Sequence, residues 1–344
     1  MRAAILETPK QLVLGQVEMP ACPSGGVLVK VSSCSICSSD ARMVINGHSG
    51  LVYPRILGHE LSGVIDESQS ELYKPGDRVQ IYPGISCGRC SACRRGETRR
   101  CIALKTLGFS EDGGFAEYLA LPATAVTTGG VNLVPENVTD EEAAMAEPLA
   151  SCLNAQERAK VGQDDSVLII GGGPLGLLHS RLSRLRGAQR VFIAEKDENR
   201  LKLASEHGRA DRVIDTSIER LPQIIRDETG GRGVDVVILS SNSTSTANLL
   251  PLLADAGRLS LFASLSKETS SVWFDINHVH YRELEVTGSF GSTAVQNTAA
   301  LKLISQGMTV ADLITMRISL EDIAEAINYT LERKGLRAVI NYNQ

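Results

Sequence analysis

The sequence lacks the features that mark membrane, secreted and disordered proteins. No apolar run approaches about 18 residues, the length that a membrane-spanning helix needs. The chain has no internal repeat, low-complexity tract or disordered linker, and its start lacks the apolar core of a signal peptide. These absences predict a folded, cytoplasmic protein with no membrane partner.

The sequence also has no excess of basic residues. Its 35 Lys and Arg against 40 Asp and Glu give a net charge of −5 and a pI near 5.8. No face is basic enough to indicate nucleic-acid binding, so we expect a small molecule as the partner. With 344 residues, 43% of them hydrophobic, the chain is long enough for two domains.

A glycine-rich segment from Gly171 to Gly176 separates an apolar run, residues 166–170, from a predicted helix start. Strand, G-x-G-x-x-G and helix together form the dinucleotide-binding fingerprint, although a lone match also fits an ordinary strand–helix turn. Gly171 suits the tight turn, Gly173 the approach of the pyrophosphate, and Gly176 close helix packing. The predicted cofactor contacts here are Gly171, Gly173, Pro174, Leu175 and Gly176.

A second apolar strand, residues 190–194, ends at Glu195, about 20 residues after the glycine loop. A carboxylate at this position binds the ribose 2′-hydroxyl and repels a 2′-phosphate, which predicts NAD rather than NADP. Two nearby cations, Lys196 and Arg200, leave NADP open. For Arg200 we expect contact with the adenine or ribose.

Strands and helices alternate after Glu195, which predicts a doubly wound parallel sheet. A polar loop, residues 240–245, fits either cofactor contact or a simple connection. His278 and His280 alternate on a segment expected to be extended, but no third ligand is near, so we expect no metal there. The expected helices are residues 199–207, 221–229, 249–256, 295–306 and 320–333, and the expected strands are 212–214, 233–239 and 258–263.

Four of the eight cysteines lie within fifteen residues, with the spacing C-x2-C-x2-C-x7-C. In a cytoplasmic protein such a cluster indicates metal ligation rather than disulfides. Four thiolates can close a tetrahedral structural zinc site, and an iron–sulfur cluster is the alternative. A zinc-finger nucleic-acid module would explain this cluster but neither the glycine motif nor the acidic balance. The predicted ligands are Cys87, Cys90, Cys93 and Cys101.

Several further motifs follow one another along the chain, each weak alone and specific in combination. They are Cys37-Ser38-Ser39-Asp40, Gly58-His59-Glu60, Gly76-Asp77-Arg78-Val79, the cysteine cluster, Gly113 to Tyr118, Glu147-Pro148-Leu149 and the glycine motif. Their order resembles the zinc-containing medium-chain dehydrogenases. Glu147-Pro148-Leu149 is similar to the sorbitol (polyol) and threonine dehydrogenase branch.

The resemblance implies an α/β protein with two domains. A GroES-like β-barrel catalytic domain would comprise residues 1–152 and 289–344, with the structural zinc lobe at 86–102. A Rossmann domain that binds NAD would comprise residues 153–288. The family also implies a homodimer or homotetramer.

The resemblance further implies a catalytic zinc held by Cys37, His59 and Glu147, with Glu60 as a neighbouring or exchanging ligand. Three protein ligands leave the open position that a catalytic zinc requires. Asp40 would orient the ligand histidine or brace its loop. Two zinc ions per chain are therefore expected, one catalytic and one structural.

Ser39 would relay the hydroxyl proton, but Arg42 occupies the position where related enzymes often have the terminal histidine. Guanidinium does not titrate usefully, so we hypothesise that the proton leaves through water or His48. The nicotinamide end would be approached by Phe262, Ser289 and Phe290.

The implied activity is NAD-dependent interconversion of a secondary alcohol and a ketone, on a polyol, cyclitol or sugar derivative. Met43 and Gly291 replace substrate-binding residues of sorbitol dehydrogenases, which puts sorbitol itself in doubt. One alternative is an L-threonine 3-dehydrogenase. Another is a catalytically silent NAD-binding protein with structural zinc alone.

Overall fold

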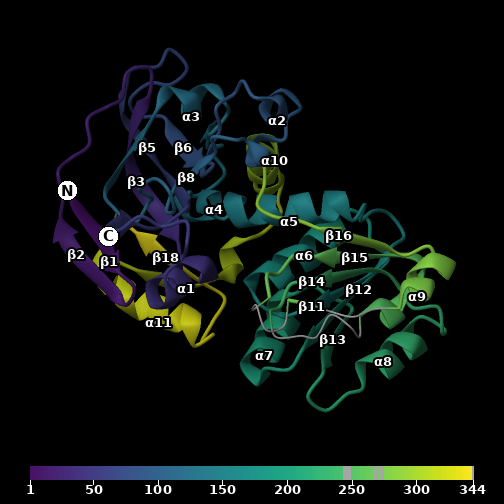
Figure 1. The fold of residues 1–344 in the computed structure, drawn as a ribbon. Helices are drawn as coiled ribbons and strands as arrows, with labels where there is room; N and C mark the ends of the chain where they lie inside the picture. The colour runs from purple at the N-terminus through teal and green to yellow at the C-terminus, as the bar shows by residue number, and fades with distance from the viewer. Residues whose placement is uncertain (243–248, 266–269, 272–274, 343–344) are drawn as a thin grey trace. The chain divides into compact units, whose positions relative to one another are not determined.

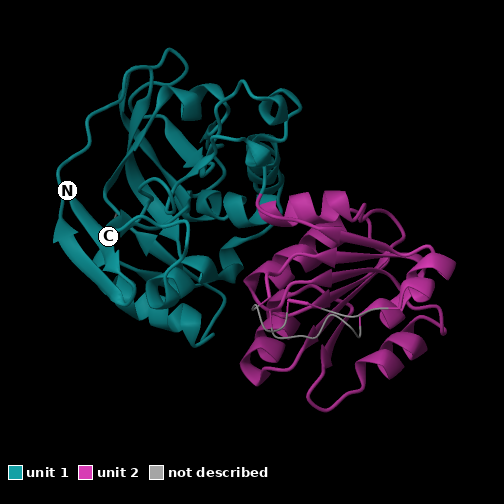
Figure 2. Cartoon of the chain, viewed as in Figure 1, with its two compact units in different colours: residues 1–150, 292–344 teal, residues 151–291 magenta. Residues whose placement is uncertain are grey.

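The computed structural model describes residues 1–242, 249–265, 270–271 and 275–342. The chain divides into two compact units (Figures 1 and 2). Unit 1 contains residues 1–150 and 292–344, and unit 2 contains residues 151–291. No helix within the described ranges combines the length and apolarity needed to cross a bilayer.

Unit 1 is built on sheets that surround an apolar core and are antiparallel except for the parallel pair of β17 and β18. Its central strand β3 (Val27–Ser35) is buried along its whole length except at Lys30, and its first half is apolar apart from that lysine. The larger sheet has the order β10-β6-β5-β3-β18-β17, with β9 also paired to β3, and a smaller sheet has the order β2-β1-β4. The other strands are β1 (Arg2–Thr8), β2 (Gln11–Gln16), β4 (Arg55–Ile56), β5 (Glu60–Ser68), β6 (Arg78–Ile81), β7 (Gly84–Ile85), β8 (Lys105–Thr106), β9 (Tyr118–Leu121), β10 (Val131–Leu133), β17 (Ile314–Ile318) and β18 (Arg337–Asn341).

Short helices surround these sheets, and the C-terminal segment contributes strands β17 and β18 to the larger one. Strand β18 pairs with β3, so residues about 300 positions apart share one ladder. The α-helices are α1 (Ser38–Asn46), α2 (Ser91–Arg94), α3 (Ala123–Thr127), α4 (Asp140–Ala144), α5 (Ala146–Arg158), α10 (Ala294–Ser305) and α11 (Ile323–Leu331), of which α5 crosses the boundary between the units.

Unit 2 contains a six-stranded sheet with the order β13-β12-β11-β14-β15-β16, in which every printed pairing is parallel. The order reverses between β11 and β14, which confirms the predicted doubly wound sheet. Its elements are β11 (Ser166–Ile170), α6 (Pro174–Leu185), β12 (Arg190–Glu195), α7 (Glu198–His207), β13 (Arg212–Asp215), α8 (Leu221–Glu228), β14 (Val234–Leu239), β15 (Leu253–Leu261), α9 (Ile276–Tyr281) and β16 (Glu285–Gly288).

Two local predictions in unit 2 are wrong. Residues 249–256 form one short 3-10 turn, Leu250–Leu252, and then the start of β15 rather than an α-helix. The apolar run is so short that the spacing of its hydrophobic residues does not distinguish a buried strand from a helix. His278 and His280 lie on helix α9 rather than on an extended segment, so a spacing of two does not place them on one face.

Candidate functional site

The first candidate site brings Cys37, His59 and Glu60 together in unit 1. One ligand atom from each of these residues lies within 4.8 Å of those of the other two. Cys37 immediately precedes helix α1, and Glu60 is the first residue of β5, where it pairs with Ser35 of β3. The β3–β5 ladder therefore joins two motifs that are separated in the sequence.

Asp40 fixes the histidine of this group. Its Oδ1 lies 3.1 Å from His59 Nδ1, and its Oδ2 accepts a hydrogen bond from the backbone N–H of Cys37 at 3.0 Å. Burial alone would lower the pKa of His59, but the charge and hydrogen bond of Asp40 outweigh it and raise the pKa. With Nδ1 held by Asp40, the other ring nitrogen is left for a metal.

Arg337 is a buried partner that the sequence analysis missed. Its Nη1 donates to both carboxylate oxygens of Glu60, at 2.8 and 2.9 Å, and to the carbonyl of Ile36 at 3.3 Å. The Arg337 and Glu60 side chains are only 3% and 1% exposed. The available signal was one charged residue inside the apolar run from Leu336 to Ile340.

Glu147 lies outside the 4.8 Å group but interacts electrostatically with it. Burial raises the pKa of Glu147 to about 7. Its neighbours act in both directions, since His59 and Arg337 lower the pKa while Glu60 and Asp40 raise it. The carboxylate, at the start of α5, is therefore part of the same charged region.

The donor set fits a divalent cation. Cys37, Asp40, Glu60 and Glu147 can each carry a negative charge, and Arg337 is the fixed cation that interacts with Cys37, Glu60 and Glu147. Thiolate, imidazole and carboxylate are the ligands that zinc prefers. These side chains can therefore hold zinc without leaving a large uncompensated charge.

The predicted relay residues lie on helix α1 or just after it. Ser39 is in the first turn of α1 and is half-buried, whereas Arg42 is exposed. His48 is exposed, and its Nδ1 accepts a hydrogen bond from the backbone N–H of Gly50 at 3.0 Å. The ring of Phe109 is 5.7 Å from that of His48 and 5.5 Å from that of His59, measured between centroids.

The second candidate site is the cysteine lobe, where Cys87, Cys90, Cys93 and Cys101 all have Sγ atoms within 4.8 Å of one another. Thiolates around a tetrahedral zinc stand about 3.8 Å apart, given Zn–S bonds of about 2.3 Å. Backbone N–H groups of Cys87 and Ala103 donate to Cys101 Sγ at 3.2 and 3.4 Å. Backbone N–H groups lower the pKa of Cys90 to about 6, whereas burial raises the pKa of Cys93 to about 11.

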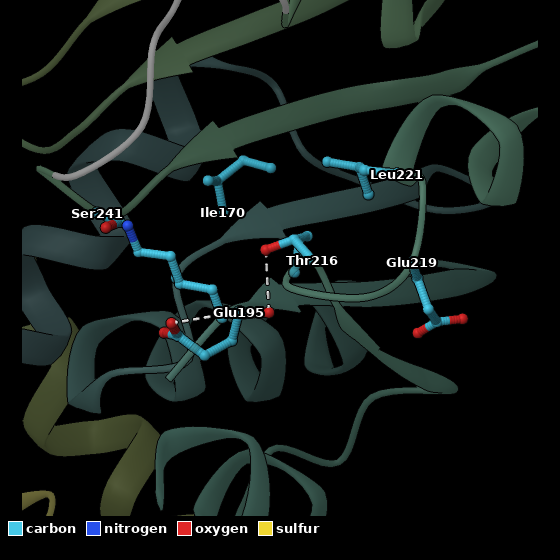
Figure 3. A pocket seen from close by; sticks show the side chains of 9 residues that line it. Ile170, Glu195, Thr216, Glu219, Leu221 and Ser241 are labelled. Atoms are coloured by element: carbon cyan, nitrogen blue, oxygen red, sulfur yellow. Dashed lines mark hydrogen bonds between the residues drawn. The ribbon is translucent and has the colours of Figure 1, made fainter. Parts of the chain in front are cut away.

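The third candidate site is a cavity of about 180 Å³ in unit 2 (Figure 3). It lies beside the glycine loop, at the carboxyl ends of β11 and β12. Its wall has an apolar part and a charged rim, formed by Ile170, Leu221, Glu195, Lys196, Thr216 and Glu219 among others. Such a cavity fits an adenosine group, with its base against the apolar wall and its ribose near a carboxylate.

The side chain of Glu195 is hydrogen-bonded to the glycine loop. Its Oε2 accepts from the backbone N–H of Gly172 at 2.8 Å, and its Oε1 accepts from the backbone N–H groups of Lys196 and Asp197 at 2.7 and 3.1 Å. Thr216 donates to the Glu195 carbonyl at 3.1 Å (Figure 3). The carboxylate therefore holds the loop as well as facing the cavity.

The glycines of the loop have distinct surroundings. Gly171 has φ +113°, a conformation that other residues rarely adopt, and a Cβ at Gly176 would collide with the Gly171 carbonyl. A Cβ at Gly173 would collide with the guanidinium of Arg200, so that space holds a cation. Pro174 and Leu175 begin helix α6.

The remaining predicted cofactor residues lie where strands β15 and β16 end. The backbone N–H of Phe262 donates to Leu239 at 3.3 Å, and that of Ser289 donates to Leu261 at 3.2 Å. Phe290 is 88% exposed. In the polar loop, residues 243–245 lie outside the described part of the chain, whereas Ser241 lines the cavity.

Comparison with known proteins identifies the family. The model of the alcohol dehydrogenase GroES-like domain matches residues 23–130, and the model of the zinc-binding dehydrogenases matches residues 174–306. The starvation-sensing protein RspB of Escherichia coli K12 is 31% identical over 333 residues, which cover 95% of each chain. The chain belongs to the zinc-binding dehydrogenases.

Solved structures of other zinc-binding dehydrogenases share the fold. One from Sinorhizobium meliloti, bound to NADP, has a TM-score of 0.90 at 29% identity and covers 99% of this chain and 98% of its own. RspB of E. coli CFT073, in complex with NADH, has a TM-score of 0.88 at 29% identity over 99% of both chains. These likenesses confirm the GroES-like and Rossmann fold class.

Relatives with named substrates include a sorbitol dehydrogenase of Bacillus subtilis, 28% identical over 97% of this chain and 95% of its own. An L-threonine 3-dehydrogenase of Marinomonas is 27% identical over 99% of both chains. As a zinc-binding dehydrogenase, the protein is an oxidoreductase of alcohols that uses zinc and a nicotinamide dinucleotide. This activity excludes a catalytically silent protein, and zinc is the metal of the family rather than an iron–sulfur cluster.

Proposed function

We propose that the protein oxidises a secondary alcohol to a ketone, or reduces the ketone, on a polyol, cyclitol or sugar derivative. The observation that supports this most is the donor group of Cys37, His59 and Glu60, of which His59 and Glu60 are buried. Glu147 interacts with this group electrostatically, and Asp40 fixes His59. In this proposal Cys37, His59 and Glu147 hold the catalytic zinc. Arg337 keeps Glu60 beside the site as a neighbour.

When bound, the zinc supplies Lewis acidity to the substrate oxygen and the nicotinamide supplies hydride acceptance. The protein's own residues orient the ligand histidine and remove the hydroxyl proton of the substrate. Asp40 holds the His59 tautomer, and Ser39 takes the hydroxyl proton towards water or His48. A pH–rate profile that is unchanged in His48→Gln would remove the His48 route.

We further propose that unit 1 is the catalytic domain and that Cys87, Cys90, Cys93 and Cys101 hold a structural zinc within it. The closeness of their Sγ atoms supports this assignment. All eight cysteines are free in the structure.

Unit 2 is proposed to bind the dinucleotide, with NAD preferred to NADP. The rim carboxylates Glu195 and Glu219 would repel a 2′-phosphate, while Lys196 is the cation on the same wall. The cofactor would be contacted at its pyrophosphate by the loop of Gly171 and Gly173 and at its adenine or ribose by Arg200. Phe262, Ser289 and Phe290 would approach its nicotinamide.

The substrate class rests on the sorbitol dehydrogenase relative and on the Glu147-Pro148-Leu149 motif. The L-threonine 3-dehydrogenase relative supports the second candidate. Threonine would need partners for both its ammonium and its carboxylate, so a substrate panel separates the two.

The test is NADH formation by zinc-assayed protein against polyols, cyclitols, sugar phosphates and threonine. We expect turnover on a polyol, cyclitol or sugar derivative that is lost in Glu147→Ala. Turnover on threonine alone would replace this proposal with the second candidate.

A further inference from the structure

Helix α6 buries a group of polar side chains inside unit 2. His179, Ser180 and Ser183 of this helix are all fully buried, as is Gln156 of helix α5. The Gln156 Nε2 atom lies 2.8 Å from the His179 carbonyl oxygen, 2.9 Å from Ser183 Oγ and 3.3 Å from His179 Nδ1. Histidine and glutamine are uncommon at fully buried positions, where apolar residues predominate.

The His179 ring is neutral and held in one tautomer. Burial lowers the pKa of His179 to about 3, so the ring carries no charge near neutral pH. A carbonyl oxygen only accepts hydrogen bonds, so the Gln156 atom beside the His179 carbonyl is the donating nitrogen, which also donates to Nδ1. The ring proton is therefore on Nε2, which has no hydrogen-bond partner among the described residues.

The His179 ring contacts the ring of Phe262. The two rings are nearly perpendicular, at 87°, and their centroids are 4.6 Å apart, which is the geometry of a favourable edge-to-face pair. Phe262 directly follows strand β15, whose Leu259 and Leu261 pack into an apolar core on one face of the sheet. Because side chains alternate along a strand, Phe262 points to the other face, where His179 meets it.

The neighbours of Phe262 across the sheet are small. The ladders that join β15 to β14 and β16 place Phe262 between Ser240 and Ser289 in the row that follows the strand. The backbone N–H of Phe262 is fixed by its hydrogen bond to Leu239 at 3.3 Å. Two serine side chains restrict a phenyl ring little, so the direction of the ring depends on His179.

We propose that His179 positions the Phe262 ring against the nicotinamide of the bound cofactor. This inference rests on the proposed approach of Phe262 to the nicotinamide. His179 acts only through Phe262 and is a positioning residue. A ring that is already fixed in the free protein loses less freedom when the cofactor binds, so the nicotinamide half of the cofactor binds more tightly.

The test compares NADH with ADP-ribose, which lacks the nicotinamide, by calorimetric titration of the zinc-loaded full chain. His179→Asn keeps an acceptor for Gln156 but removes the ring from Phe262. The affinity for NADH should fall about 3–10-fold, whereas the affinity for ADP-ribose should stay at the wild-type value. Equal losses for both ligands would indicate a deformed helix α6, whose N-terminus faces the pyrophosphate in the proposed function, and would overturn the inference.

Ser180→Ala is the matched control. It removes a buried hydroxyl from the same helix, and within the described part of the chain that hydroxyl has no hydrogen-bond partner. Neither affinity should change in this variant. A selective loss of NADH affinity as large as that of His179→Asn would show that any change in α6 has this effect and would overturn the role of His179.

Phe262→Ala separates this inference from the proposed function. It should also weaken NADH alone, and the double variant with His179→Asn should bind NADH no more weakly than Phe262→Ala does. If Phe262→Ala weakens both ligands equally or neither, the proposed place of Phe262 is wrong and the inference fails with it. If Phe262→Ala is selective but His179→Asn binds NADH normally, or if the two losses are additive, the role of His179 alone is overturned.

Discussion

The buried ion pair between Arg337 and Glu60 yields the first prediction. Removing one partner leaves an uncompensated charge in the interior, so Arg337→Met should lower the free energy of unfolding by about 3–5 kcal/mol. Urea unfolding measures the effect. Arg317→Met is the control, because the Arg317 side chain is 44% exposed in its ion pair with Glu141 and should cost about 1 kcal/mol or less. Equal losses in the two variants would contradict the prediction.

Asp40 yields the second prediction through its contact with His59. Asp40→Asn keeps the shape but removes the charge that orients the ring, so zinc affinity at this site should fall about 10–100-fold. Zinc per chain after dialysis against a graded chelator measures this loss. The cysteine lobe serves as the internal control and should keep its zinc. A variant that keeps both ions at wild-type chelator concentrations would show that Asp40 does not position the ligand.

Single residues differ in how far the sequence could predict them. The motifs around Cys37 and His59 indicated a site by resemblance, and the β3–β5 ladder shows why these residues meet. Arg337 was not predictable from its motif, because its partner Glu60 is 277 positions away and only the tertiary pairing of β18 with β3 brings them together. A single charged residue in an apolar strand indicates where a buried ion pair lies, but it does not indicate which residue is its partner.

The turn between β11 and α6 yields the third prediction. A Cβ at Gly176 would collide with the backbone carbonyl of Gly171, which cannot move without separating helix from strand. Gly176→Ala should therefore lower stability by about 1–3 kcal/mol and weaken NAD binding. Thermal unfolding and cofactor titration by fluorescence measure both effects. Gly288→Ala has no atom within 4 Å of its new Cβ and should change neither.

The cysteine lobe yields the fourth prediction. Cys93→Ser removes one of four mutually close ligands, so the protein should lose one zinc per chain and unfold at a lower temperature. Cys22→Ser is the control, because Cys22 contacts backbone carbonyls rather than other cysteines. Mass spectrometry for zinc, paired with thermal unfolding, distinguishes the two. Retention of wild-type zinc content in Cys93→Ser would exclude the lobe as a metal site.

Elements with a strong local signal were predictable, whereas short apolar runs were not. The glycine loop and its flanking β11 and α6 follow from apolar runs and turn chemistry. The prediction of a helix from Leu249 to Ala256 was wrong, because the leucines of this segment fit a buried strand and a helix equally well. Neighbouring strand β14 decides the outcome, and the local sequence does not contain that information.

The division of the chain depends on the return of the C-terminal segment to unit 1. Strands β17 and β18 extend the larger sheet beyond β3, and β18 brings Arg337 to the candidate metal site. Only the resemblance predicted this return, since nothing in the periodicity of residues 314–341 identifies their sheet.

Zinc content tests the central claim most directly. Metal analysis of the purified full chain should give two zinc ions per chain, and Cys37→Ser should give one, with the lobe zinc kept and alcohol-dependent NADH formation lost. A wild type that binds one zinc, or a Cys37→Ser variant that still binds two, would contradict the assignment of the catalytic metal to Cys37, His59 and Glu147.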